Sequence, residues 1–209
     1  MLFVTNDAYW FVRDLQETIE RPSARISATV DFSDNEETIR WLQEKDFRFG
    51  WLYIPEEIAL ARAYGHYLPN ARLNGEIIGY IKIARHKAYV LDYEAELNLP
   101  TSDAFVYDTF VLPEHRGKRI ASSLIAEALV FLRQKGYGRL WCHIPGWNAA
   151  SLSAFRRSGF RRVAHVRFFK ILGHRFFSVH PQELMRRAAS RRRSDCSRYT
   201  PEQIAEVTS

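Results

Sequence analysis

Three cationic side chains, a glycine and two hydroxyls lie close together in HRGKRIASS, residues 115–123. The stretch follows a β-like run and precedes an amphipathic segment, so we expect a helix to begin near residue 119. The first backbone N–H groups of a helix have no partner within it, and the helix dipole places partial positive charge at that end. Gly117 would let the backbone approach a ligand closely. The side chains that would add charge or hydroxyl donors are Arg116, Lys118, Arg119, Ser122 and Ser123.

This composition is typical of an anion site, and a pyrophosphate fits it better than a single carboxylate. A solvated helix start is the alternative. A second segment of the sequence helps to decide between these two interpretations. The strand-like run RLWCHI leads to a break at Pro145-Gly146, and Asn148 then heads a short helix-like stretch that closes on Gly159-Phe160.

Together the two segments resemble the acyl-CoA motifs of the GNAT superfamily of N-acetyltransferases. VLPEHRGKRIASSLI resembles the first motif, Gln/Arg-x-x-Gly-x-Gly/Ala, and NAASLSAFRRSGF resembles the second, an asparagine-headed helix that ends in Gly-Phe. The resemblance covers roughly residues 26–180. It implies acetyl-CoA or another acyl-CoA as co-substrate, no metal, and acyl transfer to an amine.

The same resemblance assigns residues to the cofactor. Backbone amides of residues 117–122 would hold the CoA pyrophosphate, and the strand before them would pair with the pantetheine arm and polarise the thioester carbonyl. Asn148 would contact the arm, although it could equally be a plain helix N-cap. The implied cofactor-binding residues are Phe110, Val111, Leu112, Arg116, Gly117, Lys118, Arg119, Ile120, Ala121, Ser122, Asn148 and Phe155.

Two positions depart from the family pattern. Arg119 stands where glycine is usual, and we expect a helical φ there, which arginine adopts readily. Phe155 stands where many members have a tyrosine that protonates the departing thiolate, and a phenyl ring has no proton to give. CoA thiolate is already a fair leaving group, since a thiol has a pKa of about 8.5.

Acyl transfer also requires a neutral amine. An alkylamine of pKa about 10.4 is almost entirely protonated near neutral pH, so a positioned base must offset roughly 4 kcal/mol. Asp108, in VYDTFV, is our candidate to orient or deprotonate the amine; a structural ion pair is the alternative. Because strand side chains alternate, Asp108 and Tyr107 should face opposite sides unless a bulge intervenes. Weaker candidates are Glu94, Glu96 and His143, the last being more often structural.

Charge is divided along the chain. Residues 1–112 carry 11 Lys and Arg against 18 Asp and Glu, a net of −7, whereas residues 113–176 carry 13 against 2, a net of +11. This division suggests an anionic ligand on one half and a cationic acceptor on the other; two solvated faces are the alternative. We therefore expect a primary amine of a small molecule or a peptide as acceptor.

The elements predict an α/β fold with a mixed, mostly antiparallel sheet, splayed after the strand that ends near Val111, and helices on both faces. The domain should span residues 26–180, between an N-terminal extension (1–25) with an edge strand at MLFV and a helix at WFVRDLQETIE, and a polar, arginine-rich tail (181–209). We expect strands at 26–32, 86–93, 103–111 and 139–144, a hairpin at 71–84, a strand pair around 172–173, and helices at 37–45, 55–65, 120–136 and 149–158.

Two other functions remain open. A CoA-binding protein without catalysis would explain Arg119 and Phe155, and the net charge of +6 would suit a nucleic-acid binder. No helix-turn-helix, zinc or RNP-like motif is present, so nucleic acid is not the expected partner. No apolar run approaches the ~20 residues of a membrane helix and no signal-peptide pattern precedes the domain, so we expect a cytoplasmic protein. The sequence does not specify an oligomeric state.

Overall fold

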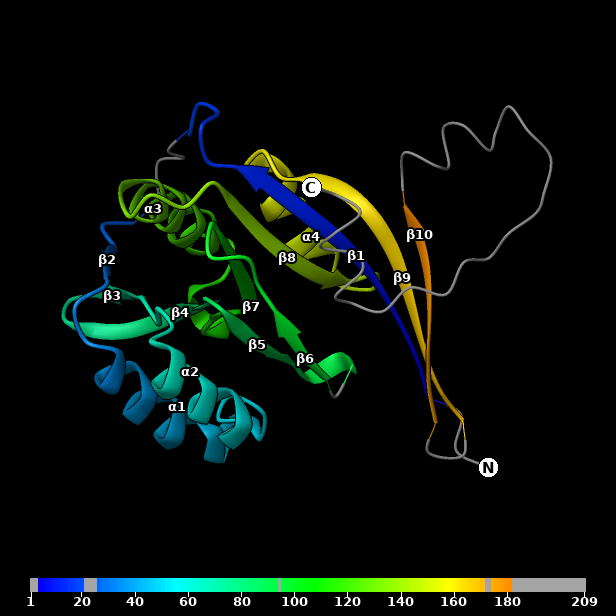
Figure 1. Ribbon diagram of the computed structural model, residues 1–209. Helices are drawn as coiled ribbons and strands as arrows, with labels where there is room; N and C mark the ends of the chain where they lie inside the picture. Colours follow the sequence, from blue (N-terminus) through cyan, green and yellow to red (C-terminus); the bar gives the residue numbers. More distant parts are fainter. Residues whose placement is uncertain (1–3, 21–25, 94, 172–173, 182–209) are drawn as a thin grey trace.

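The computed structural model describes residues 4–20, 26–93, 95–171 and 174–181 (Figure 1). Its helices are α1 (Asn35–Phe49), α2 (Pro55–Tyr64), α3 (Ile120–Gln134) and α4 (Ala149–Arg157), with two short 3₁₀ turns, η1 (Leu91–Tyr93) and η2 (Pro113–His115). Its strands are β1 (Val4–Asp14), β2 (Thr29–Asp31), β3 (Asn70–Leu73), β4 (Glu76–Ala84), β5 (Lys87–Val90), β6 (Ala95–Asn98), β7 (Asp103–Val111), β8 (Arg139–Pro145), β9 (Arg161–Ile171) and β10 (His174–Pro181). Nearly all of the predicted tail lies outside the described residues.

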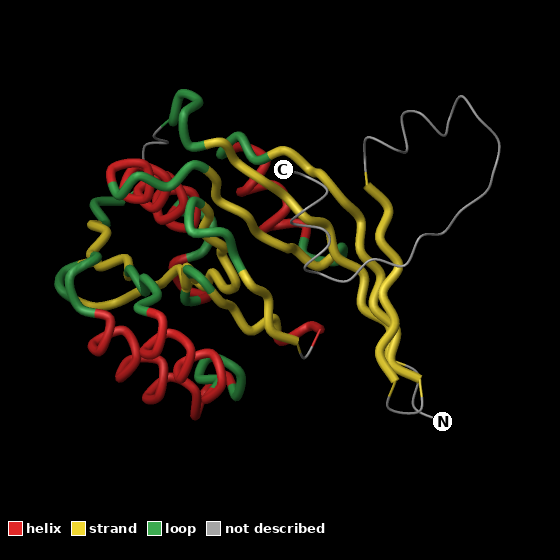
Figure 2. Tube along the Cα trace, viewed as in Figure 1, coloured by secondary structure: helices red, strands yellow, loops and turns green. Residues whose placement is uncertain are grey.

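One large sheet organises the described chain. Its eight strands follow the order β10-β9-β1-β8-β7-β4-β3-β2, and β5 and β6 form a separate pair. Every neighbouring pair is antiparallel except β7 and β8, which are parallel. Helices α1 and α2 lie on one side of the β3–β4 region and α3 on the other (Figures 1 and 2). The predicted fold class is therefore confirmed.

The N-terminal segment differs from the prediction. Residues 4–14 form β1, which pairs with β8 on one side and β9 on the other, so the helix expected at WFVRDLQETIE is wrong. Trp10, Phe11 and Val12 are all buried. A strand covered on both faces reads as a continuous apolar run, which alternation cannot distinguish from a helix. This pairing argues for counting β1 with the domain; the domain limits themselves stay a prediction.

The strands β7 and β8 separate within the sheet. Their pairing runs from Asp103↔Arg139 to Val106↔Cys142, although β7 continues to Val111 and β8 to Pro145. The sheet thus opens from Tyr107 onward, earlier than the expected point after Val111. We call this gap the β7–β8 opening.

Local signals fix the elements beside the opening. Asp34 caps α1 by accepting a hydrogen bond from the backbone N–H of Glu37. The hairpin predicted at residues 71–84 is present as β3 and β4, and it turns through Asn74 and Gly75, whose φ angles of 52° and 85° suit a type I′ turn. Within the described chain, no helix is long and apolar enough to cross a membrane.

Candidate acyl-CoA and acceptor sites

The turn into α3 carries backbone donors that no described residue uses. No described residue accepts a hydrogen bond from the amides of residues 117–122, and no side chain caps the helix. Gly117 and Arg119 have φ angles of 75° and 64°, so two left-handed residues flank Lys118, whose φ is not positive. Successive N–H groups in such a turn converge on a concave anion site. This stretch, residues 116–122, is called the anion turn below.

Arg119 departs from our expectation. Its φ of 64° is left-handed, not helical, so the position has the conformation that favours glycine. The backbone keeps the shape that a glycine would give, and the arginine side chain is added at the exposed rim. Left-handed backbone costs an L-residue about 1–2 kcal/mol, a strain that the surrounding turn must hold.

The other cations of the anion turn differ in what they contact. Arg116 donates a hydrogen bond through Nε to the carbonyl of Val111 at 3.1 Å and lies over the Phe110 ring at 5.6 Å. It therefore ties the turn to the end of β7. Lys118 donates to the carbonyl of Glu114, at 3.2 Å. Ser122 is buried, so its hydroxyl is less accessible than that of Ser123.

The predicted strand segment lines the β7–β8 opening. Phe110, Val111 and Leu112 are buried, and the backbone N–H of Leu112 donates to the carbonyl of Ile78. On the β8 side, β7 has no strand partner beyond Val106 among the described residues. The opening leads directly to the anion turn, an arrangement that can take an extended ligand with a phosphate end.

A glycine allows close packing beside this segment. A Cβ at Gly79 of β4 would lie 2.7 Å from the carbonyl oxygen of Phe110, closer than real contacts allow. Any larger residue at this position would displace the end of β7.

The second motif is placed as a helix start. Asn148 accepts a hydrogen bond from the backbone N–H of Ser151 at 3.1 Å, so the N-cap interpretation holds. Phe155 is buried in the core and meets Phe160 edge-on, with ring centroids 5.0 Å apart. Ile120 is buried in the same cluster, and Ala121 packs against it.

A cluster of charged side chains lies on the face covered by α1 and α2. Lys82 of β4 is fully buried, and its ammonium lies 2.8 Å from Glu57 Oε2, 3.2 Å from Asp108 Oδ2 and 3.0 Å from the Leu52 carbonyl. The Tyr80 hydroxyl donates to the same Asp108 oxygen at 2.5 Å. We call Glu57, Tyr80, Lys82 and Asp108 the lysine cluster.

A β-bulge shapes this cluster. Lys82 pairs with Asp108 but Ile83 pairs with Val106, so Tyr107 is an extra residue in β7. The bulge that would let Tyr107 and Asp108 share a side is therefore present. The Lys82 ammonium lies 5.9 Å from the Tyr107 ring, and the Asp108 side chain is 18% exposed, the most accessible carboxylate of the cluster.

Burial and neighbouring charges shift the pKa values of three members of the lysine cluster. Burial, opposed by Lys82 and aided by Asp108, raises the pKa of Glu57. Burial lowers the pKa of Lys82, but the two carboxylates outweigh it and the net pKa is raised. Burial and Asp108 together raise the pKa of Tyr80 well above its usual value. One ammonium thus faces two carboxylates, and the cluster can accommodate one further positive charge.

His66 supports the bulge from the loop after α2. Its Nε2 lies 2.8 Å from the Lys87 carbonyl and its Nδ1 lies 3.3 Å from the Tyr107 hydroxyl. Burial lowers the pKa of His66 to about 4, so the ring is neutral near pH 7. Nε2–H then donates to Lys87, and the Tyr107 hydroxyl donates to Nδ1.

A family model described as the acetyltransferase (GNAT) family matches residues 29–160. The chain belongs to the GNAT acetyltransferase family. The match includes both proposed motifs and the lysine cluster, whereas β1 and all of β9 lie outside it.

Individual relatives match this GNAT domain over part of their length. Streptothricin acetyltransferase of Streptomyces lavendulae is 42% identical over 55 residues, which is 26% of this chain and 29% of that protein. A GCN5-related N-acetyltransferase from Sphaerobacter thermophilus superposes with a TM-score of 0.58 at 14% identity, covering 77% of this chain and 50% of the other. The ribosomal-protein-S18-alanine N-acetyltransferase of Escherichia coli gives 0.50 at 13% identity, covering 64% and 77%. The structural matches show the shared fold.

Sequence reasoning missed Glu57 and Lys82. The available signal was a lysine within the apolar strand EIIGYIKIA, because a buried lysine needs a partner.

The weaker base candidates have different surroundings. Glu96 forms an ion pair with Lys87 at 2.8 Å, and His143 Nε2 lies 2.8 Å from Asp92 Oδ2. Glu94 lies outside the described residues.

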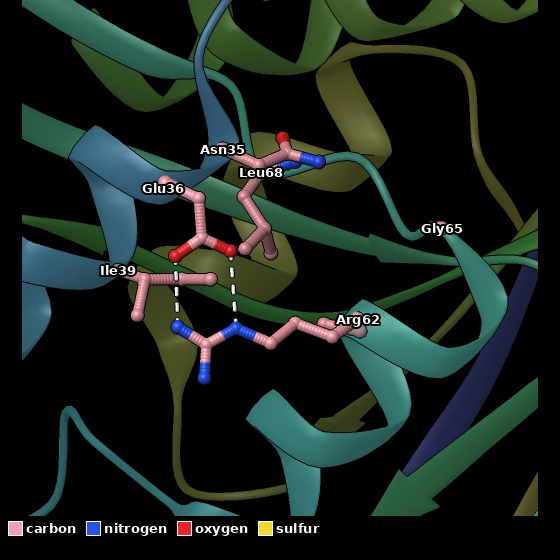
Figure 3. Close-up of a pocket in the computed structure, with 7 residues that line it drawn as sticks. Asn35, Glu36, Ile39, Arg62, Gly65 and Leu68 are labelled. Carbon is pink, nitrogen blue, oxygen red and sulfur yellow. Dashed lines mark hydrogen bonds and ion pairs between the residues drawn. The ribbon is translucent and has the colours of Figure 1, made fainter.

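A cavity of about 220 Å³ lies between α1 and α2, where Glu36 and Arg62 form an ion pair (Figure 3). It contains none of the predicted site residues. No group of three or more potential metal ligands is found among the described residues.

Proposed function

We propose that this protein is an acyl-CoA-dependent N-acyltransferase that transfers acetyl from acetyl-CoA to a primary amine by direct attack. Family membership supports acyl transfer in general. The observation that carries the finer proposal is the run of amides at residues 117–122 that have no partner among the described residues, at the end of the β7–β8 opening. These donors would hold the CoA pyrophosphate, and the opening would admit the pantetheine arm.

The reaction needs little from the protein at the leaving group. The amine nitrogen attacks the thioester carbonyl, a C–N bond forms, the C–S bond breaks and CoA departs as a thiolate. Phe155 cannot protonate it, and its ring is enclosed in the core. A thiol pKa of about 8.5 makes the thiolate stable enough to leave without a dedicated acid.

Charge supports a cationic acceptor. The Asp108 Oδ2 atom is already bound by Tyr80 and Lys82, and no described residue donates to Oδ1. The lysine cluster holds one cation against two carboxylates, so a substrate ammonium at Oδ1 would complete its charge balance. We therefore assign Asp108 the role of orienting the amine of a small molecule or a peptide. A cytoplasmic location remains a prediction from the sequence.

An acetyl-CoA turnover screen tests this proposal. The amines are spermidine, lysine, glucosamine, kanamycin, streptothricin and a lysine peptide, each measured with the full chain and with Asp108→Asn. We expect turnover with at least one cationic amine and a fall of about tenfold or more in kcat/KM for the variant. CoA binding without turnover on any amine would instead support a non-catalytic CoA-binding protein.

A further inference from the structure

His143 lies at the mouth of the β7–β8 opening. It directly follows Cys142, the last residue of β8 that pairs with β7. Its ring stacks on Phe105 at 5.9 Å with an interplanar angle of 4°. Phe105 pairs with Ala84, which shares a face of β4 with Lys82. His143 and the lysine cluster therefore lie on the same face of the sheet, on the two strands that border the opening.

The hydrogen bonds of His143 define its protonation. Nε2 lies 2.8 Å from Asp92 Oδ2, and an ionised carboxylate can only accept, so Nε2 carries the hydrogen. In the neutral ring Nδ1 then holds a lone pair. The His143 side chain is 7% exposed, and its Nδ1 atom is buried. Nδ1 has no hydrogen-bond partner among the described residues. Leaving a buried acceptor unpaired is unfavourable, so this atom is suited to a ligand N–H.

The ring is also held rigidly in place. Trp10 and Tyr93 pack on it with centroid distances of 6.2 and 5.4 Å, in addition to the stacked Phe105. A carboxylate that orients an imidazole whose second nitrogen is free is an arrangement suited to a general base.

We propose that His143, oriented by Asp92, removes the proton from the acceptor amine; this rests on the proposed function. Asp108 beside the amine favours its charged form, so a separate neutral base is needed to generate the nucleophile. The substrate ammonium first passes one proton through His143 Nδ1 to solvent, which leaves a neutral amine. The amine nitrogen then attacks the thioester; as the C–N bond forms and the C–S bond breaks, His143 Nδ1 accepts the second proton and passes it to the CoA thiolate.

The test compares His143→Gln with wild type, using acetyl-CoA and the panel amine that wild type turns over fastest. We expect kcat to fall about 100-fold or more, the usual contribution of a general base, with the Kd for CoA within about twofold of wild type. Added imidazole should restore part of the activity of His143→Gly. Asp92→Asn, which disturbs a positioning residue, should lower kcat by about tenfold, with partial recovery in Asp92→Glu. His180→Gln, in β10, is the matched control and should keep wild-type kcat.

The outcomes are separable. An active wild type with His143→Gln within about threefold of its kcat overturns this inference alone. So does a loss of kcat that parallels a loss of CoA binding, because that result indicates a structural role. A wild type without turnover overturns the proposed function and this inference with it. If the variants do not fold, nitrogen NMR of wild type decides: hydrogen on Nε2 supports the proposal, and hydrogen on Nδ1 refutes it.

Discussion

The anion turn exposes its cations and leaves its amides unpaired, whereas the lysine cluster encloses its charges between β4, β7 and α2 and pairs them with one another. The first region has donors and cations that would suit an anion. The second is complete apart from the accessible Asp108 oxygen. This difference distinguishes groups suited to binding a ligand, in the anion turn, from groups that stabilise the fold, in the lysine cluster. Three variants sharpen this contrast, in order of expected effect.

The largest effect is expected at Lys82. Lys82→Met leaves Glu57 and Asp108 buried without their cation, and breaking a buried pair in this way should lower the free energy of unfolding by about 3–5 kcal/mol. Urea denaturation measures the change. The matched control is Lys87→Met, which removes the surface pair with Glu96 and should change it by less than about 1 kcal/mol. Similar small losses in both variants would show that the lysine cluster is not a structural unit.

His66 makes stability on the cluster side depend on pH. Its folded pKa of about 4 lies below the ordinary value of 6.5, so between these values the unfolded chain takes up a proton and the folded protein does not. The stability contribution is therefore complete above pH 6.5 and is lost as the pH falls toward 4, by about 3 kcal/mol. Chemical denaturation at several pH values should show a shallower decline for His66→Gln; equal slopes would contradict this account.

The smallest effect is expected at Arg119. Replacing it with glycine relieves left-handed backbone and should raise the free energy of unfolding by up to about 1 kcal/mol. Lys118→Gly is the matched control and should lower it, since Lys118 has no positive φ. Thermal denaturation of the two variants gives the comparison. If both lower stability equally, the φ of Arg119 is not a source of strain.

Much of the fold could be predicted because its signals are local. The caps at Asp34 and Asn148, the Asn74-Gly75 turn and the apolar period of α3 each depend on a few neighbouring residues. The strand β1 could not be predicted in this way, because its position between β8 and β9 depends on strands more than 120 residues away.

The candidate site likewise has one part that depends on neighbouring residues and one part that depends on distant ones. The anion turn is one contiguous motif, so its location could be predicted from sequence, although the φ of Arg119 could not. Lys82 meets partners 25 and 26 residues away on a helix and another strand, and only the folded sheet brings them together. The roles of the individual site residues stay predictions.

The central claim is that the anion turn binds the CoA pyrophosphate. Calorimetric titration of CoA into Lys118→Glu/Arg119→Glu tests it most directly, because neither side chain supports the β7 strand as Arg116 does. The control, Arg133→Glu/Lys135→Glu, makes the same charge change at the exposed far end of α3. We expect CoA binding to weaken by at least tenfold, about 1.4 kcal/mol, in the first variant and to stay within about twofold of wild type in the control. Unchanged affinity in a folded first variant, or an equal loss in both, would contradict the claim.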